Sequence, residues 1–197
     1  MNTTTPIILG LDPGTRFLGA AVVGANKLIA YGVHELRNGE RPYDVIGHAR
    51  QVVFNYIEQQ EPQIVAIEAP YLIATKRGAV LTTLAEELQE RAKELGLSVV
   101  QLSPEVVRQA VVGKERATKI DVAEALVANG YDELRGLVPK RPVRPALGLR
   151  PRDRYWLHVF DALALTTAVS LTASETGELA SEQVLQTMPR PESPQRG

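Results

Sequence analysis

Apolar residues in the first third of the chain come in short runs that turn residues separate. The run Ile7–Leu11 is unbroken, Phe17–Val23 follows a Pro-Gly turn, and Lys27–Leu36 follows a second turn that contains Gly and Asn. Short runs bounded by Gly, Pro and Asn are typical of β-strands. The pattern therefore predicts three consecutive strands joined by tight turns, which is an antiparallel meander.

Farther along the chain, segments with helical spacing alternate with short continuous apolar runs. The spacing predicts helices over Tyr43–Gln60 and Ala79–Leu95. The runs Ile64–Ile67 and Leu97–Leu102 between and after them are typical of buried strands.

Start signals place three more helices in the second half of the chain. Ser103 precedes a proline at the first helical position, and Thr118 with Asp121 forms a capping box. Asp153 can cap a final helix from about Arg154 to Ala173. Taken together, these elements predict an α/β fold. Its mixed five-stranded sheet has three antiparallel strands and then parallel strands, with helices on both faces.

The composition is that of one ordinary domain. The chain has 197 residues, 44% of them hydrophobic, and it lacks Cys, which excludes disulfides, thiolate metal sites and cysteine nucleophiles. We expect residues 1–173 to form the domain and the polar segment 174–197 to be a flexible tail. The start lacks a basic n-region, and charges break the later apolar runs before they reach membrane-spanning length. We therefore expect a cytoplasmic protein with no membrane partner.

The net charge of −1 argues at first against a nucleic-acid partner. The average hides one basic segment, because residues 135–154 hold seven basic residues and one acidic residue. Four prolines lie within residues 139–154, so we expect an extended basic loop there. One interpretation is a flap that contacts DNA, since arginine recognises phosphate and proline limits the entropy lost on ordering. A solvated loop without a partner is the other.

Two acidic residues stand at the ends of predicted strands. Asp12 follows the first apolar run and opens the sequence Asp-Pro-Gly-Thr, and Glu68 follows Ile64–Ile67 directly. In open α/β sheets, ligands gather at the carboxyl ends of the central strands. Both acids are therefore candidates for one site, while a turn residue at Asp12 and an exposed acid at Glu68 are the alternatives.

His158 and Asp161 lie three residues apart in the final predicted helix, which puts both side chains on one face. The surrounding segment Leu157–Ala168 is otherwise apolar, so an unpaired carboxylate would be costly there. With Asp12 and Glu68, these residues offer oxygen and nitrogen ligands without sulfur. That set suits Mg²⁺, with Mn²⁺ as the alternative.

Four motifs follow one another along the chain. They are Asp12-Pro-Gly-Thr with Gly19, the strand that ends in Glu68, Val111-Val112-Gly113 ahead of Lys119, and His158-x-x-Asp161-Ala-Leu-Ala-Leu. In this order they resemble the RuvC family of Holliday-junction resolvases, over roughly residues 7–170. The resemblance implies an RNase H-like fold, a homodimer, and Mg²⁺-dependent cutting of two symmetry-related strands of a four-way DNA junction. It leaves open a branch-migration helicase as a further partner.

By position, the resemblance assigns catalysis and metal binding to Asp12, Glu68 and Asp161. His158 falls where the family has either Asp or His, so it ligates metal or orients water or phosphate. Two divalent ions can activate the attacking water and stabilise the leaving oxygen of a phosphodiester, with Asp12 as the candidate bridge between them.

Several residues are candidates for contact with DNA. Tyr71 stands where the family places an aromatic residue that stacks on a base at the opened junction, and packing over the cleft rim is the alternative. Lys119 follows the Thr118 cap, where the helix macrodipole disfavours a cation, so a phosphate bound there would explain it. The further basic candidates are Lys76, Arg77, Arg108, Lys114, Arg116, Arg141, Arg144, Arg150 and Arg152. A solvated position on its helix is the alternative for Arg108.

The predicted helix Ala79–Leu95 departs from the family pattern. Its outer face is strongly charged where the resemblance places much of the dimer interface. Without a two-fold dimer, the protein would be a nuclease for other branched DNA. An actin-like ATP-binding protein shares a loop like Asp12-Pro-Gly-Thr, but its second nucleotide-binding domain and later loop are missing here. A catalytically inactive DNA-binding module predicts a broken metal cluster, whereas all four positions here can bind metal.

Overall fold

The computed structural model describes residues 5–36, 42–69, 76–142 and 148–176. The strands in these ranges are β1 (Ile8–Pro13), β2 (Phe17–Gly24), β3 (Lys27–Glu35), β4 (Ile64–Glu68) and β5 (Ser98–Leu102). The helices are α1 (Pro42–Gln60), α2 (Lys76–Glu94), α3 (Pro104–Val112), α4 (Lys119–Ala128), the 3₁₀ helix η1 (Asp132–Leu137) and α5 (Pro151–Thr176).

The strands form one five-stranded sheet in the order β3-β2-β1-β4-β5. Neighbours from β3 to β1 are antiparallel, whereas β1 pairs with β4 and β4 with β5 in parallel. The mixed sheet predicted from the sequence is therefore confirmed. Because β1 and β4 are parallel, Asp12 and Glu68 lie at the same edge of the sheet, at the carboxyl ends of these strands.

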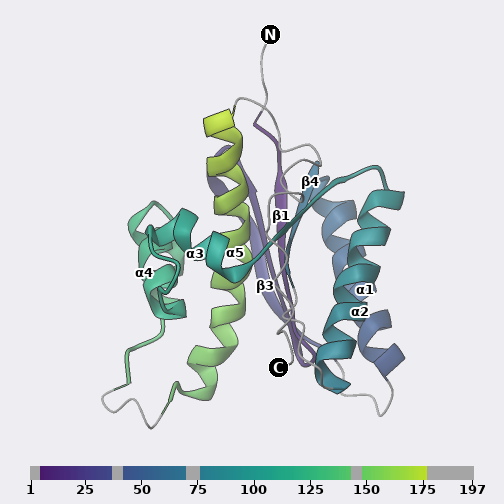
Figure 1. The fold of residues 1–197 in the computed structure, drawn as a ribbon, viewed down its shortest axis with the longest axis horizontal. Helices are drawn as coiled ribbons and strands as arrows, with labels where there is room; N and C mark the ends of the chain where they lie inside the picture. Colours follow the sequence, from purple (N-terminus) through teal and green to yellow (C-terminus); the bar gives the residue numbers. More distant parts are fainter. Residues whose placement is uncertain (1–4, 37–41, 70–75, 143–147, 177–197) are drawn as a thin grey trace, which may run out of the picture.

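Helices cover both faces of the sheet. Figure 1 shows α1 and α2 on one face, and α3, α4 and α5 on the other. Successive strand residues point to opposite faces, so Leu9 and Leu11 of β1 pack in the core beneath α1 and α2, while Ile8 packs in the core beneath α5. Burial on both sides explains why the β1 run is apolar throughout. The same alternation turns Asp12 and Glu68 toward the α5 face.

Helix α5 lies directly on β1 and β2 because glycine replaces side chains at two points of contact. A Cβ atom at Gly10 would lie 2.1 Å from the Ala162 carbonyl oxygen, and one at Gly19 would lie 2.1 Å from the His158 carbonyl oxygen. Gly19 also pairs with Asp12 in the sheet register. This close approach brings His158 next to Asp12.

Helix α2 begins earlier than the sequence predicts. It begins at Lys76 rather than Ala79, so Lys76 and Arg77 form its first turn and do not belong to the preceding loop. Thr75 directly before Lys76 is a residue type that can cap a helix, but basic residues at a helix N-terminus and Gly78 in the first turn both disfavour a start at this point. These opposing signals explain why the sequence placed the start later.

The final helix is longer than predicted at both ends. Helix α5 begins at Pro151 and ends at Thr176, so the extended basic loop expected over residues 139–154 ends before Pro151. Proline is favoured at the first helical position, which is why it starts the helix here instead of extending the loop. Asp153 and Arg152 consequently lie in the first turn of α5. The sequence analysis also missed η1, a short helix that buries Leu134.

The predicted tail overlaps the end of α5 and then leaves the described structure. Residues 177–197 lie outside the described ranges, so the division into a domain and a tail stays a prediction. Among the helices in the described ranges, none is both long enough and apolar enough to cross a bilayer.

Candidate active site

Asp12, Glu68, His158 and Asp161 come together at the carboxyl edge of the central strands. Asp12 is 6% exposed, and its Oδ2 lies 2.5 Å from Nδ1 of His158. Because an ionised carboxylate accepts and cannot donate, His158 carries its proton on Nδ1 and donates it to Asp12. Two residues that are 146 positions apart in the chain thus form one hydrogen-bonded pair.

Lys119 pairs with Asp161 in the same site. Lys119 extends from the first turn of α4, and its Nζ donates to Oδ2 of Asp161 on α5. The Asp161 side chain is only 15% exposed, so this contact neutralises a largely buried carboxylate. From the sequence, a bound phosphate was expected to explain Lys119, but the anion beside it in the structure is Asp161. The capping box of Thr118 and Asp121 that starts α4 is present as predicted.

Burial and mutual repulsion shift the pKa values of the acids in the site. Burial, followed by the nearby Asp12 carboxylate, raises the pKa of Glu68 to about 9. Burial and the Asp12 charge likewise raise the pKa of Asp161 to about 6, although the charge of Lys119 acts to lower it. Burial also acts to raise the pKa of Asp12, but the hydrogen bond and charge of His158 lower it below the usual value. The site thus holds three acidic groups, and the only basic residues paired with them in the described ranges are His158 and Lys119.

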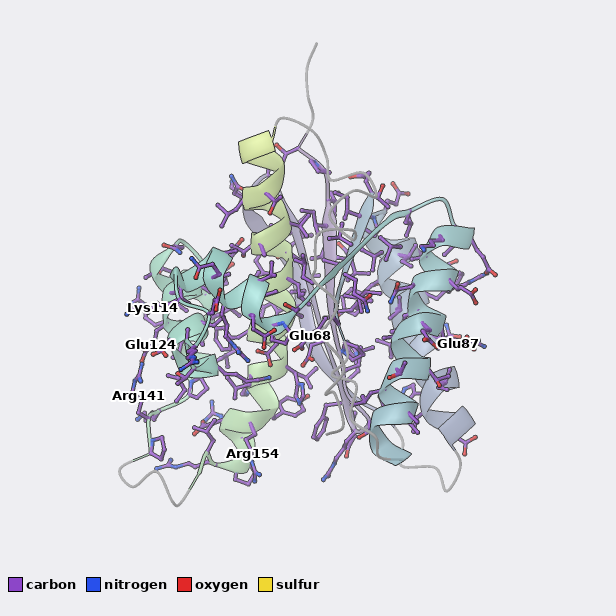
Figure 2. The ribbon with its side chains drawn as sticks, in the orientation of Figure 1. Glu68, Glu87, Lys114, Glu124, Arg141 and Arg154 are labelled. Carbon is purple, nitrogen blue, oxygen red and sulfur yellow. The ribbon has the colours of Figure 1, made fainter. Side chains whose placement is uncertain are left out.

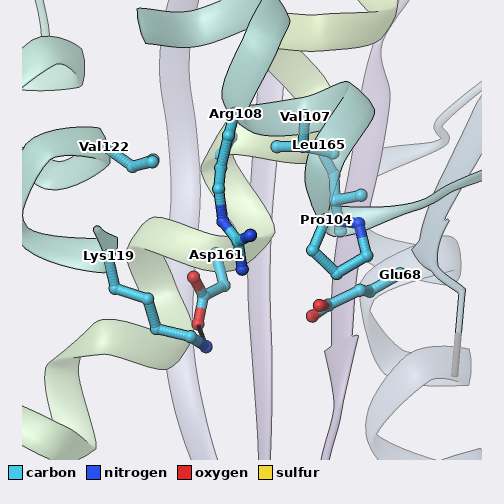
Figure 3. A pocket seen from close by; sticks show the side chains of 9 residues that line it. Glu68, Pro104, Val107, Arg108, Lys119, Val122, Asp161 and Leu165 are labelled. Atoms are coloured by element: carbon cyan, nitrogen blue, oxygen red, sulfur yellow. Dashed lines mark hydrogen bonds and ion pairs between the residues drawn. The ribbon is translucent and has the colours of Figure 1, made fainter. Parts of the chain in front are cut away.

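A small cavity opens beside these side chains. It has a volume of about 30 Å³, space for about two waters. Figure 3 shows Glu68 on one side of it, and Arg108 and Lys119 extending toward Asp161 on the other. Apolar residues of α3, α4 and α5 form the remaining wall: Pro104, Val107, Val122, Ala164 and Leu165. The acids therefore meet a concave space with cationic groups at its border.

The donor set fits a hard divalent cation, although it is not assembled around one. Asp12, Glu68 and Asp161 supply oxygens and His158 supplies nitrogen, and burial, followed by the Asp12 charge, raises the pKa values of Glu68 and Asp161. Within the described ranges, no group of three or more His, Asp or Glu side chains is arranged to hold a metal ion. Lys119 engages Asp161 instead.

Most of the basic residues predicted to contact DNA lie on the side of the sheet that carries α3, α4 and α5. Arg108 borders the cavity, and its Nη1 donates to the Glu115 carbonyl oxygen at 3.5 Å. Lys114 and Arg116 are exposed between α3 and α4, and Arg150 and Arg152 are exposed at the start of α5. Tyr71 and Arg144 lie outside the described residues, as do the side chains of Lys76 and Arg77.

Arg141 differs from the expectation of a DNA-contacting flap. Its Nη2 donates to Oδ1 of Asp121 at 2.6 Å and to Oε2 of Glu124 at 2.7 Å. Figure 2 shows Arg141 beside Glu124, so this part of the basic segment folds against α4. The hydrogen bond from Arg141 lowers the pKa of Asp121 to about 2, and the hydrogen bonds with Thr118 that cap the helix act in the same direction.

The aromatic residues that support His158 were not predicted from the sequence. The Phe17 ring lies 5.7 Å from the His158 ring and 5.4 Å from the Tyr155 ring, between centroids. Tyr155 shares a helix with His158 and stands three residues before it, a spacing that places both on one face. That spacing was the available signal. Phe17 carried no comparable signal, because its contact depends on how α5 crosses β2.

A mixed sheet of this topology, with acids at the ends of two adjacent parallel strands and a third acid on the crossing helix, defines the RNase H-like class of folds. A family model described as "Crossover junction endodeoxyribonuclease RuvC" matches residues 8–129. The chain belongs to the RuvC family.

Individual relatives agree with this assignment. The crossover junction endodeoxyribonuclease RuvC of Bacteroides fragilis is 29% identical over 125 residues, which cover 61% of this chain and 66% of that protein. The match thus spans just under two thirds of the length of that relative. The structure of Thermus thermophilus RuvC in complex with Holliday junction substrate has a TM-score of 0.63 and 26% identity, covering 86% of this chain and 96% of that chain. The yeast mitochondrial Holliday junction resolvase has a TM-score of 0.60 and 14% identity, covering 87% of this chain and 80% of that chain, and shares the fold.

Proposed function

We propose that this protein is a metal-dependent endodeoxyribonuclease that cuts four-way DNA junctions by phosphodiester hydrolysis. The observation that carries the proposal is the convergence of Asp12, Glu68, Asp161 and His158 at one edge of the sheet, beside a small cavity bordered by Arg108 and Lys119. Membership of the RuvC family and the similarity to a RuvC bound to a Holliday junction support the choice of substrate.

We propose Mg²⁺ as the cofactor, with Mn²⁺ as a substitute, held by Asp12, Glu68 and Asp161. When bound, divalent ions supply an activated water and stabilise the leaving oxygen. His158 keeps Asp12 ionised and oriented through its Nδ1 hydrogen bond. As a ligand of such an ion, Glu68, whose pKa is raised to about 9, would have to lose its proton to solvent.

Lys119 and Arg108 position the scissile phosphate in this proposal. Both border the cavity that holds Glu68 and Asp161, and both are donors without acceptor atoms. An incoming phosphate offers Lys119 a second anion besides Asp161. The exposed residues Lys114, Arg116 and Arg150, with Arg152, would contact the DNA backbone farther out.

Paired cutting requires two copies of the site, so we propose a homodimer. A second candidate follows from the charged face of α2. Arg91 there pairs with Glu94 of the same helix at 2.9 Å, and Glu87 pairs with Arg50 of α1, so these charges are satisfied within one chain. If that face stays exposed, the protein would nick other branched DNA without symmetry. A cytoplasmic location, with a branch-migration helicase as a further partner, completes the proposal.

Replacing Asp12 tests the assigned role. We expect Asp12→Asn to lower junction cutting by at least about 100-fold, since a ligand essential to the cation is lost. Binding of the junction should stay within about twofold, because the basic residues around the site are unchanged. Strand cleavage on gels and fluorescence anisotropy with a labelled junction measure the two quantities.

Asp132→Asn is the matched control, because Asp132 is an exposed carboxylate paired with Arg135 outside the site. It should cut junctions like the unmodified protein. Loss of binding by a well-folded Asp12→Asn protein, or full cutting activity in that variant, would contradict the assignment.

A further inference from the structure

An arginine and an aromatic ring flank the active site on the β2 side. Phe17 is the first residue of β2 and Arg16 directly precedes it, five and four residues after Asp12, at the same edge of the sheet. The guanidinium carbon of Arg16 lies 5.1 Å from the Phe17 ring centroid, which is a cation–π contact. The Phe17 ring in turn lies 5.7 Å from His158. One aromatic ring therefore separates this guanidinium from the residue that holds Asp12.

The ring beneath Arg16 is held in place from two sides. Tyr155 meets Phe17 edge-on at 5.4 Å, and its hydroxyl donates to the Val33 carbonyl oxygen at 2.9 Å. Trp156 meets Tyr155 edge-on at 5.1 Å. Because these contacts join α5 to β2 and β3, the surface on which Arg16 rests belongs to the rigid part of the molecule.

The guanidinium of Arg16 has a weakly bound anion. Its Nε and Nη2 lie 3.4 Å and 3.3 Å from Oε1 of Glu35, and the two side chains are 60% and 62% exposed. Exposed pairs of this kind contribute little to stability. A phosphate can form two parallel hydrogen bonds with the same fork of donors at shorter distances.

We propose that Arg16, resting on Phe17, forms a binding subsite for a backbone phosphate of the DNA strand that passes the active site. The subsite is separate from the cavity bordered by Arg108 and Lys119. DNA would therefore be held by cationic groups on both sides of the acidic residues, with Glu35 as the anion that phosphate displaces. The inference rests on the proposed function in that the ligand is DNA.

The test compares two exposed ion pairs. Arg16 and Glu35 flank the active site, whereas Arg135 and Asp132 form a pair in η1, which follows the end of α4 opposite Lys119. Arg135→Gln and Asp132→Asn thus make the same changes in charge away from the proposed subsite. A labelled four-way junction and a linear duplex, without divalent metal, are titrated by anisotropy at several salt concentrations.

We expect Arg16→Gln to weaken binding about tenfold at low salt and to reduce the slope of log K against log salt by about 0.9. Glu35→Gln should tighten binding, because a competing carboxylate is removed. The variants of Arg135 and Asp132 should change affinity by less than about twofold, since screening limits distant charges.

Equal effects of the two arginine variants, an unchanged slope for Arg16→Gln, or no DNA binding by the unmodified protein would overturn the subsite. Failure of the proposed function looks different. If the unmodified protein binds DNA with these slopes but does not cut the junction when Mg²⁺ is added, the subsite stands and the nuclease assignment falls.

Discussion

The residues of the site could be identified from the sequence, but their hydrogen-bond and ion-pair partners could not. Asp12, Glu68, His158 and Asp161 stood out in the sequence because each is polar where its neighbours are apolar, and the structure brings them to one edge. Lys119 and Asp161 are 42 residues apart, and no local pattern links them. The role of Lys119 as the partner of a buried acid depends on how α4 packs against α5. Arg141 shows the same limit, since its acidic partners Asp121 and Glu124 lie on α4.

Away from the site, His34 provides a pH-dependent contribution to stability. His34 lies between β3 and α1, where its Nε2 is 3.0 Å from the Tyr56 hydroxyl. Burial, and then the charge of His48, lowers the pKa of His34 below its usual value. The unfolded chain therefore binds this proton more readily than the folded protein does. The stability from neutral His34 is present above about pH 6.5 and declines as the pH falls below that value.

Urea unfolding of the unmodified protein and His34→Gln between pH 7.5 and 5.5 checks this prediction. The raised pKa values of Glu68 and Asp161 act in the opposite direction in this range, so the difference between the two proteins is the quantity to follow. The stability of the unmodified protein relative to that of His34→Gln should fall on acidification. A difference that is independent of pH would show that His34 titrates normally.

At the scale of elements, order and type were predictable, whereas several ends were not. All five strands and the helices up to α4 follow from periodicity and from caps such as Thr118. The starts of α2 and α5 were missed because Lys76 and Pro151 resemble loop residues when only the sequence is read. The close crossing of α5 over β1 and β2 depends on Gly10 and Gly19, and a glycine in a strand does not by itself predict which helix packs on it.

At Gly19, α5 lies too close to β2 to leave room for a side chain. A Cβ atom there would lie 2.1 Å from the carbonyl oxygen of His158 and 2.9 Å from its Cβ atom. We expect Gly19→Ala to displace α5, to destabilise the fold by about 1–3 kcal/mol, and to lower cutting by separating His158 from Asp12. Urea unfolding and junction cleavage measure both effects.

Gly47 is the matched control. It lies in α1, and a Cβ atom added there meets no atom within 4 Å. Gly47→Ala should leave cutting unchanged and stabilise the protein by about 0.5–1 kcal/mol, because alanine favours the helix. Equal stabilities for the two alanine variants would mean that α5 does not rest on Gly19 as described.

At the scale of the whole molecule, charge is divided between two layers. The layer of α3, α4 and α5 carries Arg108 and Lys119 at the acidic site, and the layer of α1 and α2 holds the ion pairs Arg50–Glu87 and Arg91–Glu94. A net charge of −1 therefore conceals a cationic side that suits a phosphate backbone. The family and fold could be predicted from the order of the four motifs. The assembly could not, because a single chain does not determine which surface meets a second copy.

The most direct test of the account is a map of the nicks made in a four-way junction and in a linear duplex of the same sequence. Each substrate is incubated with the protein in Mg²⁺ and in EDTA, with every strand labelled in turn. The account predicts symmetric nicks on two opposite strands of the junction in Mg²⁺, with no nicks in EDTA and none in the duplex. Equal cutting of the duplex, or cutting that persists in EDTA, would contradict it.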